Sequence, residues 1–261
     1  MFKRFCSDLK RYYQYAVRSA SASLKAEVAG SYLNWVWWVF NPLCFMMIYA
    51  FIFGVVFDAR EEYFGLFIFI GLSMWEFFNS TMQHSVKIIK NNKAIVTKIY
   101  MPKFVLVLAD MMVNAFKMGI SFVIVALMMA INRVPLSWSI LWAVPVILVL
   151  FVVTFGFALI LTHLGVLVQD MPNIVLIVLR LLFYFTGVFY DIEKRVPAPL
   201  NNLAVRVNPL GCLITQMRRA LLSGRIVLAD YLLIWLAAGL LISALGVYLI
   251  YKNENSYVKV I

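Results

Sequence analysis

Charged residues are scarce in this sequence. Only 13% of its 261 residues are Asp, Glu, Lys or Arg, and 64% are hydrophobic, whereas soluble domains carry about 25% charged residues. A soluble core cannot absorb that much apolar surface. Several stretches of about 20 residues run almost without charge, which is the length of helix that crosses the hydrocarbon core of a bilayer. The composition therefore predicts an all-α polytopic membrane protein.

Motifs for nucleotide binding and hydrolysis are missing as well. No glycine is followed by lysine, so there is no G-x-x-x-x-G-K-[ST] loop to hold ATP phosphates. The histidines, His84 and His163, form no H-E-x-x-H motif, and no serine lies in a G-x-S-x-G elbow. The cysteines, Cys6, Cys44 and Cys212, lie too far apart for metal-ligand spacing. We expect no enzyme activity and no cofactor in this chain, so energy for any work would come from a partner or a gradient.

The net charge of +11 does not indicate nucleic-acid binding. The Lys and Arg residues gather at the flanks of apolar stretches, as topology signals do. Six of these stretches qualify as spans and form one transmembrane domain over 34–261. The predicted spans cover roughly residues 34–57, 64–83, 104–131, 138–168, 172–190 and 231–250.

The distribution of Lys and Arg also predicts the orientation of the chain. Two segments are rich in these residues, whereas the loops after the first and third spans hold one each, Arg60 and Arg133. Basic loops remain in the cytoplasm, so we expect both termini on that side. The basic residues are Lys3, Arg4, Lys10, Arg11, Arg18 and Lys25 before the first span, and Lys87, Lys90, Lys93, Lys98 and Lys103 between the second and third.

Residues 191–225 break this pattern, because they are basic and yet the alternation of spans places them outside. They contain two short apolar runs that are too brief to cross a membrane. Asn208 and Pro209 separate these runs, and Pro197 and Pro199 flank them. Short helices broken by proline suit a re-entrant pair that dips into the membrane where protein or water covers the backbone. A loop packed on the outer surface is the alternative.

Residues 1–33 form a separate element before the first span. Aromatic and aliphatic side chains recur at near-helical spacing between Phe2 and Tyr15, with Lys and Arg between them. This pattern predicts an amphipathic helix in the cytoplasmic interface of the membrane. A frayed basic tail is the alternative.

The segment 84–103 between the second and third spans is basic and amphipathic. Its lysines recur at a spacing of three and share one helical face, while isoleucines occupy another. It therefore predicts a short coupling helix that docks a soluble partner, with ordinary flanking charge as the alternative. A second turn, 169–173, lies on the same side. The residues expected to meet the partner are Lys87, Lys90, Lys93, Ile95, Lys98, Ile99, Tyr100 and Asp170.

Four charged residues lie within predicted spans, where charge is costly and usually has a role. At 1.5 Å per residue, Glu76, Asp110 and Arg180 each lie about 10 Å from the cytoplasmic edge. Lys117 lies further along its span. The shared depth predicts that Arg180 pairs with Glu76 or Asp110. A proton relay is the alternative, although it would need a longer chain of carboxylates or histidines.

Aromatic residues are abundant in the second and fifth spans. Facing a channel, they would offer flat platforms along which sugar rings could slide. Packing residues or lipid-facing residues are the alternative, because the sequence alone does not assign faces. The candidates are Trp75, Phe78, Phe183, Tyr184, Phe189 and Tyr190.

The order of motifs along the chain resembles a known family, the permease subunits of type-2 ABC exporters. The resemblance covers nearly the whole length and is to the branch that exports polysaccharides and teichoic acids. The similar stretches are LKAEVAGSYLNWVWWVFNPL at 24–43, GLSMWEFF at 71–78, NNKAIVTKIYMPK at 91–103, QDMPNIVLIVLRLLFYFTGVFYDIEKRVP at 169–197 and NPL at 208–210.

This resemblance implies a homodimer of six-span subunits around a central pathway. Each subunit would bind, through the coupling segment, a separate ABC ATPase that holds ATP and Mg²⁺. Residues 2–30 match the family's interface helix, and 198–222 match its two outer gate helices. A lipid-linked glycan would enter from the membrane near the first and fifth spans.

The expected function is export of a lipid-linked cell-surface polymer across a bacterial inner or plasma membrane. O-antigen, capsule-like polysaccharide and wall teichoic acid are the candidate cargoes, and a drug or ordinary lipid is the nearest alternative. An intramembrane transferase would need a converging acid and base cluster, whereas only scattered groups such as Asp58, Glu61 and Asp191 are available on the outer side. A passive channel or scaffold is the third class, which ATPase binding by the coupling segment would exclude.

Overall fold

The computed structural model describes residues 2–29, 33–56, 62–98, 100–195, 197, 205–224 and 229–260. Within these ranges the chain forms helices and connecting turns. Ile99 and Pro199 lie outside the described residues, as does most of the first short outer run.

The described helices follow the apolar stretches of the sequence. Their bounds, in chain order, are α1 (Phe2–Ala29), α2 (Asn34–Tyr49) with a π-helical continuation (Ala50–Val56), α3 (Phe64–Asn91), α4 (Lys93–Lys98), α5 (Phe104–Ile131), a 3-10 turn (Trp138–Trp142) leading into α6 (Ala143–Leu167), α7 (Met171–Phe185), α8 (Ile192–Arg195), α10 (Pro209–Arg218) with a π-helical turn (Arg219–Ser223), and α11 (Ala229–Val260).

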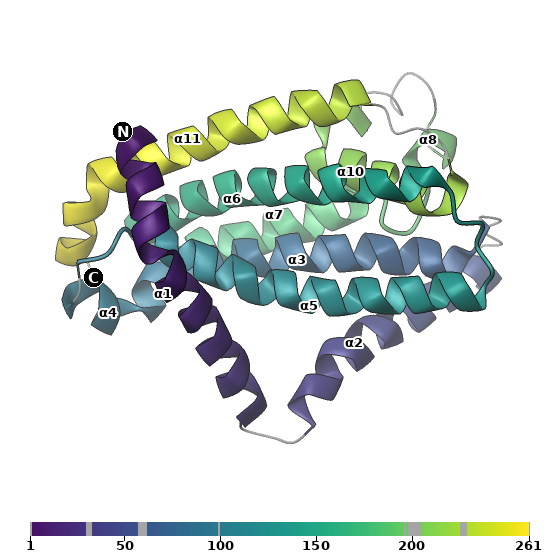
Figure 1. Ribbon diagram of the computed structural model, residues 1–261, viewed down its shortest axis with the longest axis horizontal. Helices are drawn as coiled ribbons and strands as arrows, with labels where there is room; N and C mark the ends of the chain where they lie inside the picture. Colours follow the sequence, from purple (N-terminus) through teal and green to yellow (C-terminus); the bar gives the residue numbers. More distant parts are fainter. Residues whose placement is uncertain are drawn as a thin grey trace.

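The helices α3, α5, α6, α7 and α11 run along the long axis of the molecule (Figure 1). The start of α1, the end of α11 and α4 lie together at one end, which we call the α4 end. The helices α8 and α10 lie toward the opposite end, which we call the α10 end. Helix α1 leaves the bundle obliquely and meets α2 at an apex. Both termini therefore share one end of the bundle.

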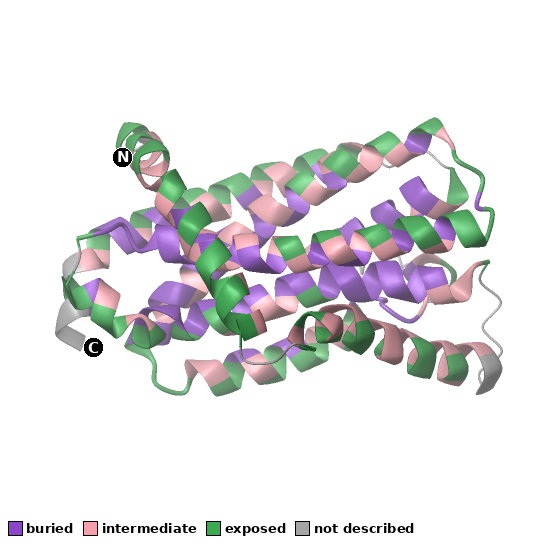
Figure 2. Cartoon of the chain, turned by 60° about the horizontal axis from the view of Figure 1, so that its bottom comes forward, coloured by how far each residue is buried: buried purple, intermediate pink, exposed green. Residues whose placement is uncertain are grey.

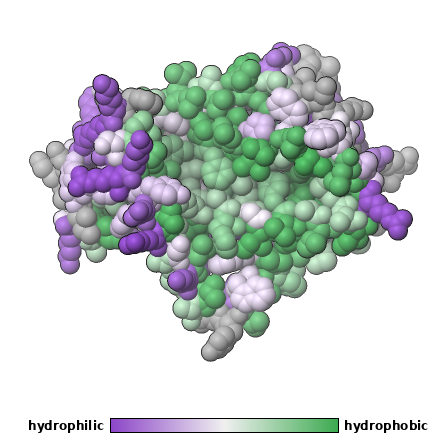
Figure 3. All heavy atoms as spheres, viewed as in Figure 1, coloured by the Kyte–Doolittle hydropathy of each residue, from purple (hydrophilic) through white to green (hydrophobic). Residues whose placement is uncertain are grey.

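Four helical stretches are long and apolar enough to cross a membrane: Asn34–Gly54, Phe104–Ile131, Trp138–Leu167 and Ala229–Glu254. Helix α3 is as long as α5, at 28 residues, but is more polar, and the apolar α7 has only 15 residues. In Figure 3 the apolar side chains cover the middle of the visible face, and polar side chains gather at its two ends. The molecule is thus built to cross a membrane along its long axis.

Several predicted boundaries move. Helix α3 continues to Asn91, so Lys87 and Lys90 belong to α3, and the separate helix predicted for the coupling segment, α4, has only six residues. Helix α7 ends at Phe185 rather than 190, because Gly187 turns the chain at a φ of +69°, a conformation that glycine adopts without steric cost. Hydropathy detects only the apolar part of a helix, whereas the helix itself continues as long as its backbone hydrogen bonds do.

Burial differs sharply between the helices. Helix α3 holds 18 buried residues and lies at the centre of the bundle, against α5, α6, α7 and α10. Helix α2 holds none, although its mean composition is strongly apolar, and Figure 2 shows it without a buried residue. A strongly apolar helix with no buried residue lies against lipid or against another protein.

Helix α6 packs against α3 at a point where only glycine fits. A Cβ atom placed on Gly165 would lie 2.0 Å from the carbonyl oxygen of Val86 on α3. Close to this point, the hydroxyl of Thr162 donates a hydrogen bond to the carbonyl of Ser85 at 3.2 Å. Small residues bring helix backbones together in membrane proteins, so Gly165 fixes the spacing of α3 and α6 near the α4 end.

Replacing Gly165 by alanine is expected to force these backbones apart and to cost about 1–3 kcal/mol. Thermal unfolding of the purified protein in lipid nanodiscs measures the loss. The matched control is Gly119→Ala on α5, where an added Cβ meets no atom within 4 Å. Equal melting temperatures for the two variants would contradict the proposed close approach.

Candidate functional site

The coupling segment forms a basic surface at the α4 end. Asn92 interrupts the helix between α3 and α4, and its side-chain amide donates a hydrogen bond to the carbonyl of Ile88 at 2.8 Å. Within α4, Val96 is buried and Ile95 is half-buried against the bundle. Exposed side chains face away from the bundle, and they are those of Lys87, Lys90, Lys93, Lys98, Tyr100 and, at the start of α7, Asp170.

Tyr100 ties this surface to both ends of the chain. The Arg4 Nη2 atom of α1 donates to the Tyr100 hydroxyl at 2.8 Å and lies 2.9 Å from the Glu254 Oε1 atom of α11. The Tyr100 hydroxyl donates to the same Glu254 oxygen at 3.0 Å. This hydrogen bond raises the pKa of Tyr100, and the bond from Arg4 to Glu254 raises the pKa of the Arg4 guanidinium.

A second layer supports this network. The Arg4 guanidinium lies 4.4 Å from the centre of the Tyr251 ring, and the Tyr251 hydroxyl donates to Asp8 at 2.6 Å. Lys103 is buried behind Tyr100, where burial lowers its pKa and its ammonium donates to the carbonyl of Met101 at 3.0 Å. The chain segment between α4 and α5 is therefore held by α1 and α11 together.

Removing the Tyr100 hydroxyl is expected to leave the folded chain intact, because the site is exposed and such a hydrogen bond is worth about 0.5–1.5 kcal/mol. The Tyr100→Phe variant should still bind a soluble partner. The movement of that partner should be transmitted to the bundle less efficiently, so transport per ATP hydrolysed should fall several-fold. The control is Tyr13→Phe, an exposed tyrosine of α1. Equal transport per ATP in both variants would show that the network does no coupling.

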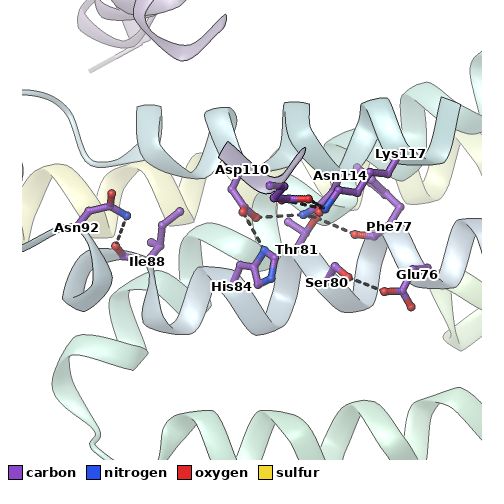
Figure 4. Close-up of polar contacts among 11 residues, drawn as sticks. Glu76, Phe77, Ser80, Thr81, His84, Ile88, Asn92, Asp110, Asn114 and Lys117 are labelled. Carbon is purple, nitrogen blue, oxygen red and sulfur yellow. Dashed lines mark hydrogen bonds and ion pairs between the residues drawn. The ribbon is translucent and has the colours of Figure 1, made fainter. Parts of the chain in front are cut away.

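The charged residues inside the bundle do not pair as predicted. Asp110 lies 2.9 Å from the His84 Nδ1 atom, and it accepts a hydrogen bond from Asn114 at 3.1 Å (Figure 4). Glu76 accepts one from Ser80 at 2.7 Å. Arg180 is exposed on α7 and forms no ion pair with any described residue. The predicted pairing of Arg180 with Glu76 or Asp110 is therefore wrong within one chain.

Lys117 also has a partner that the sequence did not indicate. Its ammonium lies 2.7 Å from a carboxylate oxygen of Glu27, near the end of α1. The sequence indicated which helix carries each charged residue, but not which face of the helix it occupies. Helix α1 thus contacts α5 at Lys117, about halfway along α5, and not only at the α4 end.

The predicted channel aromatics gather into one cluster. Ring centroids lie 5.2 Å apart for Trp75 and Phe183, and 4.9 Å apart for Phe183 and Phe189. Phe189 also contacts Tyr49 at 4.2 Å and stacks on Phe53 at 5.1 Å, two aromatics that the sequence reading missed.

Most of the six predicted aromatics are enclosed by their own chain. Trp75, Phe78 and Phe189 are buried, and Phe183 and Tyr190 are half-buried. Tyr184 is exposed on α7, and the Tyr190 hydroxyl donates to its carbonyl at 3.0 Å. Within one chain the cluster joins α2, α3 and the end of α7, so it positions these helices against one another.

At the α10 end, Asn208 and Pro209 begin α10. The Asn208 side-chain oxygen accepts hydrogen bonds from the backbone of Leu210 and Gly211 at 3.1 and 3.2 Å, and its amide donates to Thr186 at 3.2 Å. This is the usual role of asparagine at a helix N-cap. Pro197 is exposed. Helix α10 itself is buried against α3 and α6.

Arg218, at the end of α10, is buried and only 6% exposed. Its guanidinium donates to three backbone carbonyls, those of Phe67 at 2.9 Å, Gly187 at 2.8 Å and Val188 at 2.6 Å. It also lies 3.4 Å from the centre of the Phe67 ring. Arg218 thus joins α10 to α3 and to the turn after α7. Its contact in that turn, Val188, directly precedes Phe189 of the aromatic cluster.

Two arginines of this basic region have partners within the protein. Arg218 is enclosed by carbonyls, and the neighbouring Arg219 forms an ion pair with Glu193 of α8. Both guanidinium groups are therefore held by contacts within the protein, Arg218 by carbonyl oxygens and Arg219 by a carboxylate. The sequence showed the charge of these residues but not their partners.

Comparison with known proteins decides the family. Residues 19–222, more than three quarters of the chain, match the ABC-2 type transporter family. The chain belongs to this family. As an ABC-2 permease it is a multi-pass membrane subunit of a transporter, which associates with an ABC ATPase, and the predicted resemblance is confirmed.

The ABC-2 permease is also similar to curated proteins along most of its length. Two from Klebsiella pneumoniae, each called O-antigen export system permease protein RfbA, are 28% and 26% identical over 91% of both chains. A protein of the same name from Myxococcus xanthus is 27% identical over 82% of both chains. These relatives are permeases whose names state the export of O-antigen.

Proposed function

We propose that this ABC-2 permease exports a lipid-linked cell-surface polysaccharide of the O-antigen type, driven by ATP hydrolysis in a separate subunit. The similarity to O-antigen permeases over 91% of both chains carries this proposal, because it extends over nearly the whole chain rather than one segment. Capsule-like glycan and wall teichoic acid are related cargoes, and a drug or ordinary lipid is the second candidate.

The proposed assembly is a homodimer with six spans in each subunit and both termini in the cytoplasm. The exposed apolar faces of α2 and α7 support it, since these helices stand next to each other around the aromatic cluster. Phe185 on α7 and Phe51 after α2 are both more than 60% exposed. A second copy would cover these faces. Arg180 and Tyr184 on α7 would then face the pathway between the subunits.

The proposed mechanism is a shift between two states of the permease. An ATPase dimer that binds ATP and Mg²⁺ would close beneath the α4 end and press on the basic coupling surface. This works only if the ATPase binds the two permease states with different affinity. The α10 segment, as a re-entrant outer gate, would open at the opposite end.

Depletion of the permease in its own cells tests the proposal. We expect lipid-linked glycan to accumulate on the cytoplasmic side while the glycan at the cell surface is lost. Re-expression of the permease from a plasmid should reverse both changes. Normal surface glycan without an internal pool would reject polysaccharide export and would direct attention to drugs or lipids as cargo.

A further inference from the structure

A cleft of about 360 Å³ lies between α2, α3 and α5, separate from the aromatic cluster. Helix α2 lines it with Trp37, Trp38 and Phe45. Helices α3 and α5 contribute polar residues to the other walls, Glu76 and Ser80 on α3 among them, beside apolar ones. Its volume falls in the range of about 300–1,000 Å³ that is typical of small-molecule sites.

The polar walls follow from the spacing of residues on two helices. On α3, Glu76, Ser80 and His84 recur every four residues and share one face (Figure 4). On α5, Asn114 and Lys117 recur at three residues and line the same cleft. Trp75 and Phe78 of α3 point instead into the aromatic cluster. Helix α3 thus lies between the aromatic cluster and the polar residues of the cleft.

These polar groups satisfy each other only in part. His84 is held by Asp110, and Lys117 by Glu27, but Glu76 accepts from Ser80 and forms no ion pair with any described residue. Polar side chains within a membrane are expensive and usually functional. A carboxylate, hydroxyls, an amide, an imidazole and an ammonium together offer hydrogen-bond donors and acceptors to a ligand.

The charges of the cleft disfavour a phosphate group. Of the residues that line the cleft, Lys117 is paired with the carboxylate of Glu27, and His84 with that of Asp110. Glu76 adds a carboxylate that forms no ion pair with any described residue, so the site has no excess positive charge. A neutral, hydroxyl-rich ligand fits this balance, because hydroxyls both donate and accept hydrogen bonds. The aromatic wall of α2 adds a flat apolar surface, and Trp37 is 56% exposed.

We propose that this cleft binds a sugar of the lipid-linked cargo. The inference rests on the proposed function. The cleft lies at membrane depth beside α2, a helix without buried residues, so only sugars attached to a lipid reach it. Helix α1 closes its edge through the ion pair of Glu27 with Lys117. Cargo would be held here before it enters the pathway between the subunits.

Photocrosslinking in the intact permease–ATPase complex, in cells that make the glycan, tests this site. A benzophenone amino acid replaces Trp37 in one strain and Trp35 in a matched control. Both tryptophans are 56% exposed on α2, but Trp37 lines the cleft and Trp35 does not. After irradiation the permease is purified and analysed by mass spectrometry for saccharide adducts. We expect several-fold more adduct at Trp37 than at Trp35.

Two further variants separate the possible outcomes. Trp38 replaced in the same way gives a second probe of the cleft, and the exposed Tyr184 gives a probe of the pathway. Saccharide adducts at Tyr184 but not at Trp37 or Trp38 would overturn the cleft and leave the proposed function standing. Equal adducts at Trp35 and Trp37, or lipid adducts without sugar at the cleft, would also overturn it. Failure of the proposed function would instead appear as normal surface glycan after depletion.

A cleft-filling variant, Ser80→Leu, adds an independent measurement. The leucine would occupy the space beside Glu76 and remove its hydrogen-bond donor. We expect the adduct at Trp37 to fall several-fold while the adduct at Tyr184 falls less. An unchanged adduct at Trp37 in a folded Ser80→Leu complex would contradict sugar binding in the cleft.

Discussion

Replacing Arg218 by methionine is expected to cost about 3–5 kcal/mol of stability and to abolish most export. The substitution removes the guanidinium and leaves the buried carbonyls of Gly187 and Val188 without a donor, and unsatisfied buried groups of this kind are costly. Export should fall because Arg218 fixes α10 to the turn that positions Phe189. Thermal unfolding in nanodiscs and the amount of surface glycan measure the two effects.

Two matched variants separate the hydrogen bonds of Arg218 from its charge. Arg218→Lys keeps the charge, but an ammonium lacks the planar fork that reaches three carbonyls. The stability of this variant should therefore lie between that of Arg218→Met and that of the natural protein. Arg219→Met removes a half-buried arginine that pairs with Glu193, and should cost much less. Equal stability for Arg218→Met and Arg219→Met would contradict the role assigned to Arg218.

Reversing the charge of Lys93 and Lys98 together is expected to weaken ATPase binding about tenfold or more, because charge complementarity governs such contacts. Both lysines are exposed on α4, away from the packed face of Val96, so the permease itself should fold normally. Co-purification of the ATPase with the Lys93→Glu, Lys98→Glu variant measures the effect. Transport should fall with it.

The control carries the same change of charge at the opposite end of the bundle. Arg133 and Lys194 are exposed near the α10 end, and the double variant Arg133→Glu, Lys194→Glu should retain the ATPase. If both double variants bind the ATPase as the natural permease does, α4 is not the docking surface.

The sequence predicted the helices better than their faces. Long apolar runs were sufficient to predict the main helices, four of which are long and apolar enough to cross a membrane, because this signal is local. The end of α3 could not be predicted from hydropathy, since residues 84–91 are amphipathic rather than continuously apolar and yet remain helical. Arg180 lies on a helix, α7, as predicted, but its predicted partner was wrong, because the rotation of α7 about its axis decides which residues Arg180 contacts.

Long-range contacts were the least predictable part of the site. Arg4 and Glu254 are separated by 250 residues, and neither lies in a pattern that points to the other. The contacts of Arg218 are with backbone carbonyls, which every residue carries, so no sequence signal could identify them. The abundance of aromatic residues in two predicted spans was enough to identify most of the aromatic cluster. Tyr49 and Phe53 belong to the cluster only because of how α2 and its continuation pack near the end of α7.

Reconstituted transport tests the central claim most directly. The permease and its ATPase would be placed in liposomes with the ATPase facing outward and with isolated lipid-linked glycan in the outer leaflet. The account predicts that added ATP and Mg²⁺ carry the glycan inward, where it becomes protected from a membrane-impermeant periodate reagent, and that the Lys93→Glu, Lys98→Glu complex does not. ATP hydrolysis without protection of the glycan, or protection without ATP, would contradict ATP-driven polysaccharide export.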